Sequence, residues 1–546
     1  AELRRVALAL GDDFGLLFVA LSYRWLEKGN PDPQGFHLAI IARVAALYLG
    51  LLGNKMEDQI RTTIFGKLKT RPDHPSDLYQ AFEAKGLGPP DFALFWDYGS
   101  LFQQPRVGAE NDLFLPGLKA SNIWYGHAHT VCWIQSELPK GFAKRMKEQG
   151  LAETYDESGW CFVEAAISAA VKRGARRLDL ALRWGLAYDW SKKGDEGWHE
   201  NFYGPDKPSM IEQMRLTAVC ARGRLPPPLP EEVDRLLRTE KKFTASSDVD
   251  TVSELYRAFF ENVALSASLG FRLLKWGDVE AQQLGLVLPR FAKLQSLDLS
   301  ENNLGAAGAK AVASFVIVSG SLTQVDLSGN RLGGVWTEFE YGKFVQKGSY
   351  LAEGIKAISE AIAVSGSLTQ IDLSNNAMCG VTTDRFRYTS GIYTSEGIKA
   401  ISKAISVSGS LTSVDVGMNN IGKDMALELI SVFTQKQMTF VGLEGCDLGP
   451  DGAKVAAEYI SDSGSLTQIN LSSNLLGGYV VVDGYDRYGD VNKTKFVADT
   501  QGILAIADAL RVSRSLTTVN LTFNQCKKSA EAALREAGAH LKELRL

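Results

Sequence analysis

The residues in this sequence whose types could support chemistry stand far apart. His127 and His129 offer two imidazoles, but no carboxylate or cysteine accompanies them at ligand spacing, so we expect a corner before a strand and no metal site. The six cysteines are scattered singly, which is typical of a reducing compartment. This pattern predicts a cytoplasmic protein, while the start at Ala1, without Met, leaves import into an organelle open.

Length and charge narrow the classes of function. A chain of 546 residues predicts two to four domains. The 59 Lys and Arg residues against 63 Asp and Glu give a net charge of −4, which argues against a dedicated nucleic-acid binder. The most apolar stretch, residues 36–52, is shorter than the roughly 20 apolar residues of a membrane span, so we expect a buried helix there.

The elements that would position catalytic residues lie in the first 245 residues. Three apolar runs, 15–23, 91–99 and 129–135, predict strands of a parallel sheet covered on both faces. An amphipathic helix is expected to begin near Ser158 and to end at Gly174. The pattern predicts an α/β domain with a parallel, flavodoxin-like sheet.

The order of these pieces resembles a Toll/interleukin-receptor (TIR) domain. Ser22-Tyr23-Arg24 at the end of the first run is similar to that family's opening strand, and Asp97 ends the run that would be its second strand. The segment from Ser158 through Trp160 and Cys161 to Glu164 is similar to the family's S-x-W-C-x-x-E signature.

The resemblance implies a site and a reaction. In enzymatically active members the signature glutamate carries NAD cleavage, so Glu164 is the candidate catalytic residue, and Ser22, Arg24, Asp97 and Trp160 are candidates for an NAD pocket. NAD would be the substrate, with no cofactor required. A carboxylate can stabilise the oxocarbenium-like species, and nicotinamide needs no general acid to leave. The resemblance also implies self-association through this domain.

The sequence departs from the TIR family at several points, and these departures weaken the assignment of the family's activity to this chain. The interval from Ser22 to Asp97 is 75 residues, and residues 175–245 extend beyond a minimal TIR domain. No G-x-x-x-x-G-K-[ST] phosphate loop precedes the C-terminal half, so an ATP-driven switch is not expected. The structural alternative is that Glu164 pairs on a helix face while Trp160 and Cys161 pack in the core.

The C-terminal half repeats one phrase. LTQVDLSGNRLG and its variants start at Leu294, Leu322, Leu368, Leu411, Met438, Leu466 and Leu516, in steps of 28, 46, 43, 27, 28 and 50. Each unit predicts a strand, a turn at an asparagine and a helix, and stacked units form a solenoid. This resembles ribonuclease-inhibitor-type leucine-rich repeats, which fold as a horseshoe. We therefore expect a TIR-like domain at 1–245, a linker and capping helix at 246–265 and repeats at 266–546.

The turn asparagines and three insertions set the details of the repeats. The turns are predicted at Asn303, Asn330, Asn376, Asn420, Asn474 and Asn524. Insertions at about 335–351, 380–394 and 479–499 share one register, so they should gather along one edge and build a protein-binding surface. Its candidate contact residues are Trp336, Phe339, Tyr341, Phe386, Tyr388, Tyr393, Tyr485 and Tyr488. The alternative is that these aromatics cover the solenoid's own core.

Two classes of function follow. In the first, the repeats bind a protein partner or ligand, and the TIR-like domain signals by self-association or hydrolyses NAD. In the second, the chain is a non-enzymatic scaffold or an accessory subunit of a larger complex, docked through the aromatic insertions. Nicotinamide release from NAD, compared between the wild type and Glu164→Ala, separates the two.

Overall fold

The chain forms two compact units, Ala1–Val263 and Ala264–Leu546. The computed structural model describes residues 2–27, 29–49, 77–103, 105–172, 176–182, 220–340, 343–383, 389–485 and 491–546. The unit boundary lies later than residue 245 because the helix α12 (Asp248–Ala264), which we expected to cap the repeats, contacts the first unit. Phe259 of α12 packs against Gly126, and the Asn122 side chain bonds to the Leu255 carbonyl.

The first unit contains a parallel sheet of four strands, β1 (Phe18–Tyr23), β2 (Ala93–Phe95), β3 (Val131–Gln135) and β4 (Arg177–Asp179). Their spatial order is β2-β1-β3-β4, with β1 flanked by β2 and β3 in parallel register. The three predicted apolar runs each contain a strand, although the second strand is only three residues long. This order begins a doubly wound sheet of the flavodoxin-like kind.

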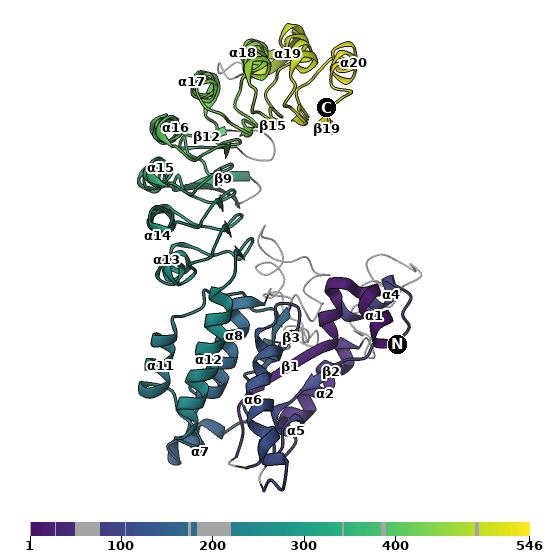
Figure 1. Ribbon diagram of the computed structural model, residues 1–546, viewed down its shortest axis with the longest axis vertical. Helices are drawn as coiled ribbons and strands as arrows, with labels where there is room; N and C mark the ends of the chain where they lie inside the picture. Colours follow the sequence, from purple (N-terminus) through teal and green to yellow (C-terminus); the bar gives the residue numbers. More distant parts are fainter. Residues whose placement is uncertain are drawn as a thin grey trace. The chain divides into compact units, whose positions relative to one another are not determined.

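Helices cover both faces of this sheet (Figure 1). On one face α2 (Phe36–Tyr48) and α4 (Asp77–Ala84) pack on Val19, Leu21 and Trp133. On the other face lie α6 (Glu110–Gly126) and α8 (Gly159–Val171). The other helices among the described residues of this unit are α1 (Glu2–Leu10), η1 (Gly11–Leu17), α5 (Asp97–Ser100), α7 (Phe142–Glu148) and α11 (Pro230–Thr239).

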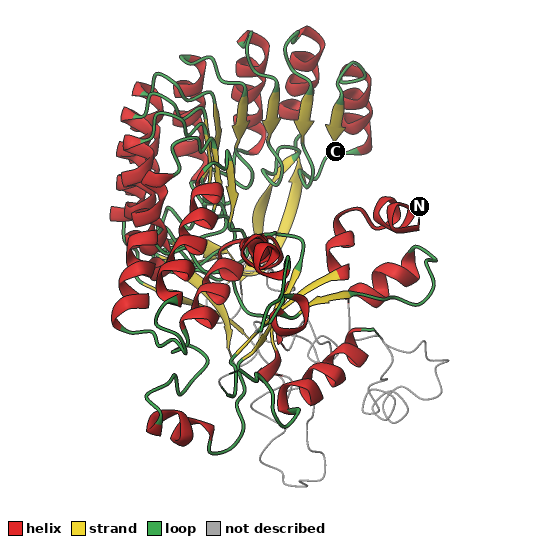
Figure 2. Cartoon of the chain, turned by 60° about the horizontal axis from the view of Figure 1, so that its bottom comes forward, coloured by secondary structure: helices red, strands yellow, loops and turns green. Residues whose placement is uncertain are grey.

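The second unit is a right-handed coil of strand and helix units whose strands form one parallel sheet of nine (Figure 2). The strands follow chain order: β5 (Ser268–Gly270), β6 (Ser296–Asp298), β7 (Gln324–Asp326), β10 (Gln370–Asp372), β13 (Ser413–Asp415), β14 (Phe440–Gly442), β15 (Gln468–Asn470), β18 (Thr518–Asn520) and β19 (Glu543–Arg545). In each repeated phrase the strand starts two residues after the residue that opens it. The repeat register predicted from sequence is therefore confirmed.

The helices of the second unit lie on the outer side of the sheet. They are α13 (Asp278–Val287), η4 (Leu288–Arg290), α14 (Ala306–Val318), α15 (Glu353–Val364), α16 (Glu396–Val407), α17 (Gly422–Thr434), α18 (Gly449–Asp462), α19 (Gln501–Val512) and α20 (Lys528–Ala537). One face of each α-helix carries buried apolar residues, such as Val312 and Phe315 in α14 and Ile355 and Ile358 in α15.

A ladder of buried asparagines joins successive repeats. Its members are Asn302, Asn330, Asn376, Asn419, Asn474 and Asn524, none more than 7% exposed. Each side-chain amide donates to carbonyls of its own and the preceding repeat. The predictions for Asn303 and Asn420 were wrong by one residue, because the buried asparagine stands three residues after the buried apolar residue that directly follows the strand, Leu299 or Val416.

All three insertions fold as antiparallel β-hairpins between a turn and a helix. The first pairs β8 (Val335–Glu340) with β9 (Lys343–Gly348), the second β11 (Val381–Thr383) with β12 (Thr389–Gly391), and the third β16 (Gly478–Tyr485) with β17 (Val491–Ala498). The first two hairpins contact each other, with Gln346 bonded to the Gly380 carbonyl. The shared position places all three along one edge of the solenoid, called here the hairpin edge.

Within the described residues, no helix has the length and apolar character needed to cross a membrane. The apolar segment that begins at residue 36 forms α2 and buries Ile41, Val44 and Tyr48 in the core of the first unit. The expectation of a buried helix there is confirmed for residues 36–48.

Candidate functional site

Helix α8 holds Glu164 against the first strand of the N-terminal sheet. The helix begins at Gly159, where a side chain would collide with the ring of Phe243. Cys161, Glu164 and Ile167 share the helical face that turns toward the sheet, since they follow at three-residue spacing. The Cys161 thiol accordingly bonds to the Tyr23 carbonyl at 3.3 Å.

A chain of short hydrogen bonds leads to the Glu164 carboxylate. The Ser22 hydroxyl donates to Glu164 Oε2 at 2.5 Å, and Tyr155 Oη lies 2.5 Å from Ser22 Oγ. Because Ser22 has one proton to give, Tyr155 is the donor to Ser22. Burial raises the pKa of Glu164 to about 8; the Ser22 hydrogen bond opposes this shift, and the charge of Asp97 adds to it. Sequence reasoning missed Tyr155, which stands only three residues before Ser158.

Asp97 lies at the carboxyl end of β2, where it begins α5. Its carboxylate accepts hydrogen bonds from the Tyr23 hydroxyl at 2.8 Å and from the Trp25 indole at 3.2 Å. Burial raises the pKa of Asp97, and these bonds oppose the shift. The structure therefore brings Ser22 and Glu164 into direct contact, whereas the described bonds of Asp97 go to Tyr23, Trp25 and Tyr98.

Three buried polar side chains near the carboxyl ends of β1 and β3 have atoms for which the described residues supply no partner. Arg24 is 5% exposed; its guanidinium donates to the Trp25 carbonyl, and its Nε has no partner among the described residues. His37 bonds to the Arg24 carbonyl through Nε2 but leaves Nδ1 unpaired, and Gln135 leaves Oε1 unpaired. In doubly wound sheets ligands bind outside the carboxyl ends of the strands, where the strand order reverses. Here that point lies between β1 and β3.

The fourth residue of the expected pocket, Trp160, contacts α12. Its indole donates to Asp248 at 2.9 Å. Its described hydrogen bond therefore goes to α12, while Glu164, four residues later on α8, is bonded to β1. The assignment of Trp160 to a nucleotide pocket stays a prediction.

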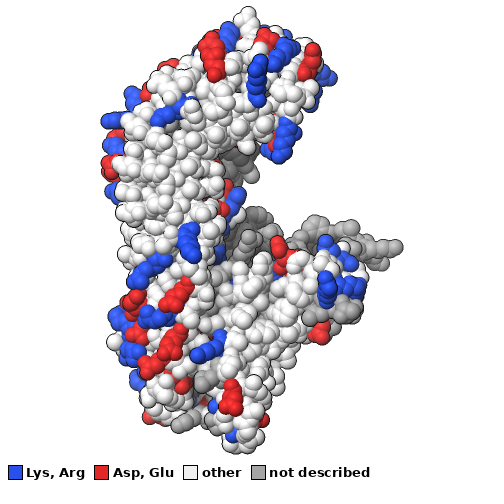
Figure 3. All heavy atoms as spheres, viewed as in Figure 1, with Lys and Arg blue, Asp and Glu red and all other residues white. Residues whose placement is uncertain are grey.

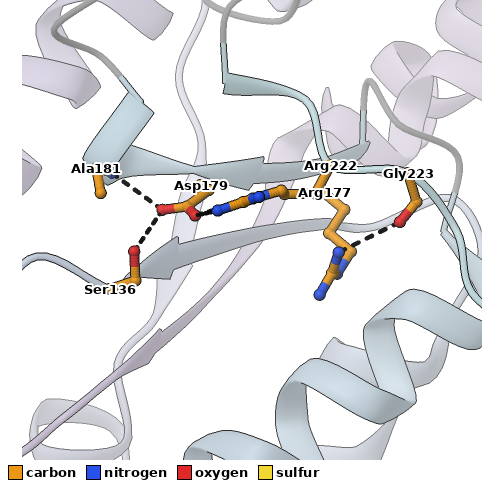
Figure 4. A network of polar contacts seen from close by, with 6 residues as sticks. All are labelled: Ser136, Arg177, Asp179, Ala181, Arg222 and Gly223. Carbon is orange, nitrogen blue, oxygen red and sulfur yellow. Dashed lines mark hydrogen bonds and ion pairs between the residues drawn. The ribbon is translucent and has the colours of Figure 1, made fainter. Parts of the chain in front are cut away.

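A second polar network lies at the carboxyl ends of β3 and β4 (Figure 4). Asp179 at the end of β4 is 2% exposed and accepts bonds from Ser136, from the Ala181 amide and from the Arg222 guanidinium. Arg177 on the same strand bonds to the Gly223 carbonyl. Both oxygens of the Asp179 carboxylate therefore have hydrogen-bond partners. Ala181 and Arg222, which lie on either side of residues 183–219, are both bonded to β4 through this carboxylate. This network is structural, and no sequence motif predicted it.

The histidine pair lies on the surface. His127 and His129 are exposed, and burial and the neighbouring His129 lower the pKa of His127. Across the described ranges, no group of three or more His, Cys, Asp or Glu side chains could hold a metal ion.

The described aromatic side chains of the hairpin edge divide into two groups. Trp336 and Phe339 pack within the first hairpin: Trp336 donates to Glu338 at 2.7 Å and lies under the Arg331 guanidinium, and Phe339 contacts Phe344. Tyr393 is 50% exposed, although its hydroxyl binds the Ile421 carbonyl. Tyr341, Phe386 and Tyr388 lie outside the described residues, as does Tyr488, and the side chain of Tyr485 is not described.

The exposed apolar residues of this edge include several that sequence reasoning did not list. Ile392 is 88% exposed, and Tyr479 and Val480 on the third hairpin are each about half exposed. Large apolar side chains in such exposed positions are available for contact with another molecule.

Comparison with known proteins supports the repeat assignment. A family model described as Leucine Rich repeat matches residues 292–313, which contain β6 and the start of α14. The match agrees with the architecture of the second unit, a solenoid of strand-and-helix repeats like that of leucine-rich-repeat proteins. No curated protein matches the chain.

Solved structures similar to this chain include one that is described as a leucine-rich repeat-containing protein. The protein LegL7 from Legionella pneumophila is 15% identical, over 50% of this chain and 80% of its own, with a TM-score of 0.28. The tropomodulin C-terminal domain of Caenorhabditis elegans is 14% identical, over 34% and 91%, with a TM-score of 0.25. The chain of a TLR13–ssRNA13 complex is 13% identical, over 48% and 36%, with a TM-score of 0.23. With scores this low, the fold assignment depends on the repeat register and the matched segment.

Proposed function

We propose that the repeat solenoid binds a protein partner through its hairpin edge. Protein interaction is the usual role of leucine-rich repeats, and the observation that carries the proposal is the hairpin edge itself. Three insertions at one register all form hairpins, and two of them expose Ile392, Tyr393, Tyr479 and Val480 to a large extent. Exposed aromatic and aliphatic groups of this kind supply most of the binding energy in protein interfaces.

Part of the aromatic set also holds the solenoid together. Tyr350 and Tyr393 occupy equivalent positions before α15 and α16, and each hydroxyl bonds to a carbonyl of the next repeat, at Met378 and Ile421. The alternative expectation, that the aromatic residues of the insertions cover the core of the solenoid, therefore applies to these two tyrosines. The ring of Tyr393 stays half exposed, so it serves both roles in this proposal.

The test uses matched surface variants of the full chain. We expect proteins retained from the source cells by the wild type to be lost in the double variant Ile392→Ser, Tyr479→Ser. They should be kept by Val364→Ser, which removes an apolar side chain of intermediate exposure (64%, against 88% for Ile392 and 48% for Tyr479) from the end of α15. Equal retention by the double variant, or equal loss in the control, would refute the hairpin edge as the binding surface.

A second function is favoured by the buried Arg24. Within the described part of the chain the Arg24 guanidinium has no carboxylate partner, and a guanidinium at the switch point of a doubly wound sheet suits an anionic group such as a nucleotide phosphate. Glu164 is bonded to Ser22, which lies two residues before Arg24 in the first strand. The buried guanidinium and this carboxyl group together support a TIR-like unit that hydrolyses NAD. Water would add to the anomeric carbon as the bond to nicotinamide breaks, giving nicotinamide, ADP-ribose and a proton.

The electrostatics of Glu164 shape the expected activity. Ionised Glu164 would stabilise the positive charge that develops on the ribose, so the raised pKa of about 8 predicts a rate that increases from pH 6 to pH 8. Nicotinamide release should be lost in Glu164→Ala and kept in Glu157→Ala, a partly exposed carboxylate of the preceding turn. The assay is run on each oligomeric form separated by size exclusion, because self-association belongs to the TIR-like proposal. No release from any form, or release unchanged in Glu164→Ala, would rule out this second function.

A further inference from the structure

Glu164 is bonded differently from carboxylates on the surface of the first unit. Over α11, Figure 3 shows acidic and basic side chains next to one another, and Arg235 bonds to Glu232 there at 2.7 Å. This hydrogen bond lowers the pKa of Glu232. The described hydrogen bonds of the Glu164 carboxyl come instead from hydroxyl groups, those of Ser22 and Tyr125. The ionisation of Glu164 therefore depends on where these hydroxyls direct their protons.

Tyr125 on α6 is the weaker of the two donors. Its hydroxyl donates to the Leu21 carbonyl at 2.9 Å, and a tyrosine has only one proton to give. The Ser22 hydroxyl donates to Glu164 Oε2 at 2.5 Å, and this bond lowers the pKa of Glu164 more than the contact with Tyr125 does. Ser22 is therefore the main donor to the ionised carboxyl.

Tyr155 directs the proton of Ser22. A serine hydroxyl has one proton and two acceptor positions, and it rotates to suit its neighbours. Tyr155 Oη lies 2.5 Å from Ser22 Oγ, whereas the other acceptor described for this hydroxyl, the Cys161 carbonyl, is 3.4 Å away. The Tyr155 proton thus goes to Ser22, and the Ser22 proton is left for Glu164. Hydrogen bonds in such a chain strengthen one another.

The turn that carries Tyr155 is fastened by backbone hydrogen bonds. The Ser158 amide donates to the Tyr155 carbonyl at 3.2 Å. The Lys242 amide donates to the Glu157 carbonyl at 2.8 Å, and the Lys242 carbonyl accepts from the Gly159 amide at 3.1 Å. Tyr155 itself is 4% exposed. These contacts give its hydroxyl a fixed place beside β1.

The other titratable groups around Glu164 supply no competing donor of charge. Tyr23 on β1, Cys132 on β3 and Cys161 on α8 have pKa values that burial raises, so they stay neutral between pH 6 and pH 9. Asp97 at the end of β2 contributes a negative charge, which opposes the ionisation of Glu164. The hydroxyl chain has to act against both this charge and burial.

We propose that Tyr155 is the positioning residue for Glu164: through Ser22 it fixes the orientation of the carboxyl and favours its ionised form. The inference rests on the proposed hydrolysis of NAD, since it names the residue that prepares Glu164 for that reaction. Tyr155 acts through Ser22 and needs no contact with the substrate.

The first test is the titration of Glu164 in the full chain without NAD. The carboxyl ¹³C signals of glutamate-labelled protein give its midpoint, and Glu164→Gln identifies its signal. From about 8 in the wild type, the midpoint should rise by about one pH unit in Ser22→Ala and by about half a unit in Tyr155→Phe, because the bond to the charged form is lost or weakened. The double variant should titrate as Ser22→Ala does, since Tyr155 acts through Ser22.

Tyr48→Phe is the matched control for the loss of one buried hydroxyl. Tyr48 is 1% exposed, and its hydroxyl donates to the Leu16 carbonyl at 2.8 Å in the core on the other face of the sheet. Its variant should leave the titration of Glu164 unchanged. An unchanged midpoint in Tyr155→Phe, an equal shift in Tyr48→Phe, or a larger shift in the double variant than in Ser22→Ala would overturn the proposal. Failure of Tyr155→Phe alone to fold would assign Tyr155 to structure and overturn it as well.

Nicotinamide release is the second readout, and it separates this proposal from the proposed function. The increase of the rate with pH should begin about half a unit higher in Tyr155→Phe than in the wild type, with release at pH 9 largely kept. A profile that does not move would contradict the positioning role. No release from the wild type in any oligomeric form would refute NAD hydrolysis, while the titration would still decide whether Tyr155 positions Glu164.

Discussion

The buried asparagines of the repeats and the buried polar side chains at the carboxyl edge of the N-terminal sheet are equally hidden but differently paired. Asn376 and Asn419 are 0% exposed, as are His37 and Gln135. The amide of Asn376 donates to three carbonyls, whereas His37 and Gln135 each leave one polar atom without a partner in the described chain.

The difference follows from how the two regions are built. Each repeat presents the same carbonyls in the same register, so one asparagine position finds its partners six times over. At the N-terminal edge each strand ends with a different residue, so no repeated backbone register supplies each polar side chain with a hydrogen-bond partner. Unpaired buried atoms are uncommon in folded proteins and point to a bound ligand or water. The ladder is thus structural, and the N-terminal edge is the better candidate for binding.

The largest effect that this comparison predicts is on the ladder. Asn376→Ala should lower the free energy of unfolding of the repeat unit by about 3 kcal/mol, because three backbone carbonyls lose their donor in a buried site. Urea unfolding followed by far-UV circular dichroism measures the change. Asn303→Ala is the matched control, since its amide has one bond, to the Lys275 carbonyl. Equal losses in the two variants would remove the distinction between ladder and surface asparagines.

The sequence predicted the repeats well because it samples one unit seven times. Strand positions, the outer helices and the place of the insertions all followed from the register. Asn302 and Asn419 were misplaced because each has an asparagine beside it, and only the spacing from Leu299 or Val416 distinguishes the two. The burial of individual hairpin residues could not be predicted. Trp336 packs within its hairpin whereas Ile392 is exposed, and the composition of the insertions does not distinguish the two.

The N-terminal site was less predictable. The three apolar runs predicted the strands β1, β2 and β3, and the segment around Glu164 predicted the helix α8. The hydrogen bonds that define the site join residues 133 and 142 positions apart, Ser22 with Tyr155 and Ser22 with Glu164. Such contacts depend on how α8 packs on β1, and no local pattern encodes them. The same holds for Asp179 and Arg222, which flank residues 183–219.

The next prediction concerns the protonation of Glu164. Its pKa is raised to about 8 in the folded unit, against an ordinary value of 4.5, so between these values the folded protein holds a proton that the unfolded chain has released. Raising the pH from 5 to 7 should therefore destabilise the wild type relative to Glu164→Gln by about 2.5 kcal/mol, since each pKa unit corresponds to about 1.4 kcal/mol. Thermal unfolding of both proteins at pH 5, 6, 7 and 8 tests this; parallel curves would show that Glu164 is as ionised as a surface carboxylate.

The smallest predicted effect on stability is at Arg24. If its guanidinium awaits a ligand, Arg24→Met should change the free energy of unfolding by less than about 1 kcal/mol, because the variant removes a buried charge that has a single described hydrogen bond. Arg177→Met is the matched control: Arg177 is 9% exposed, and its guanidinium bonds to Ser168 and to the Gly223 carbonyl, so its loss should cost more. Urea unfolding of both variants without ligand makes the comparison. A loss at Arg24 as large as that at Arg177 would place Arg24 with the structural polar groups and remove the main support for an anion at this edge.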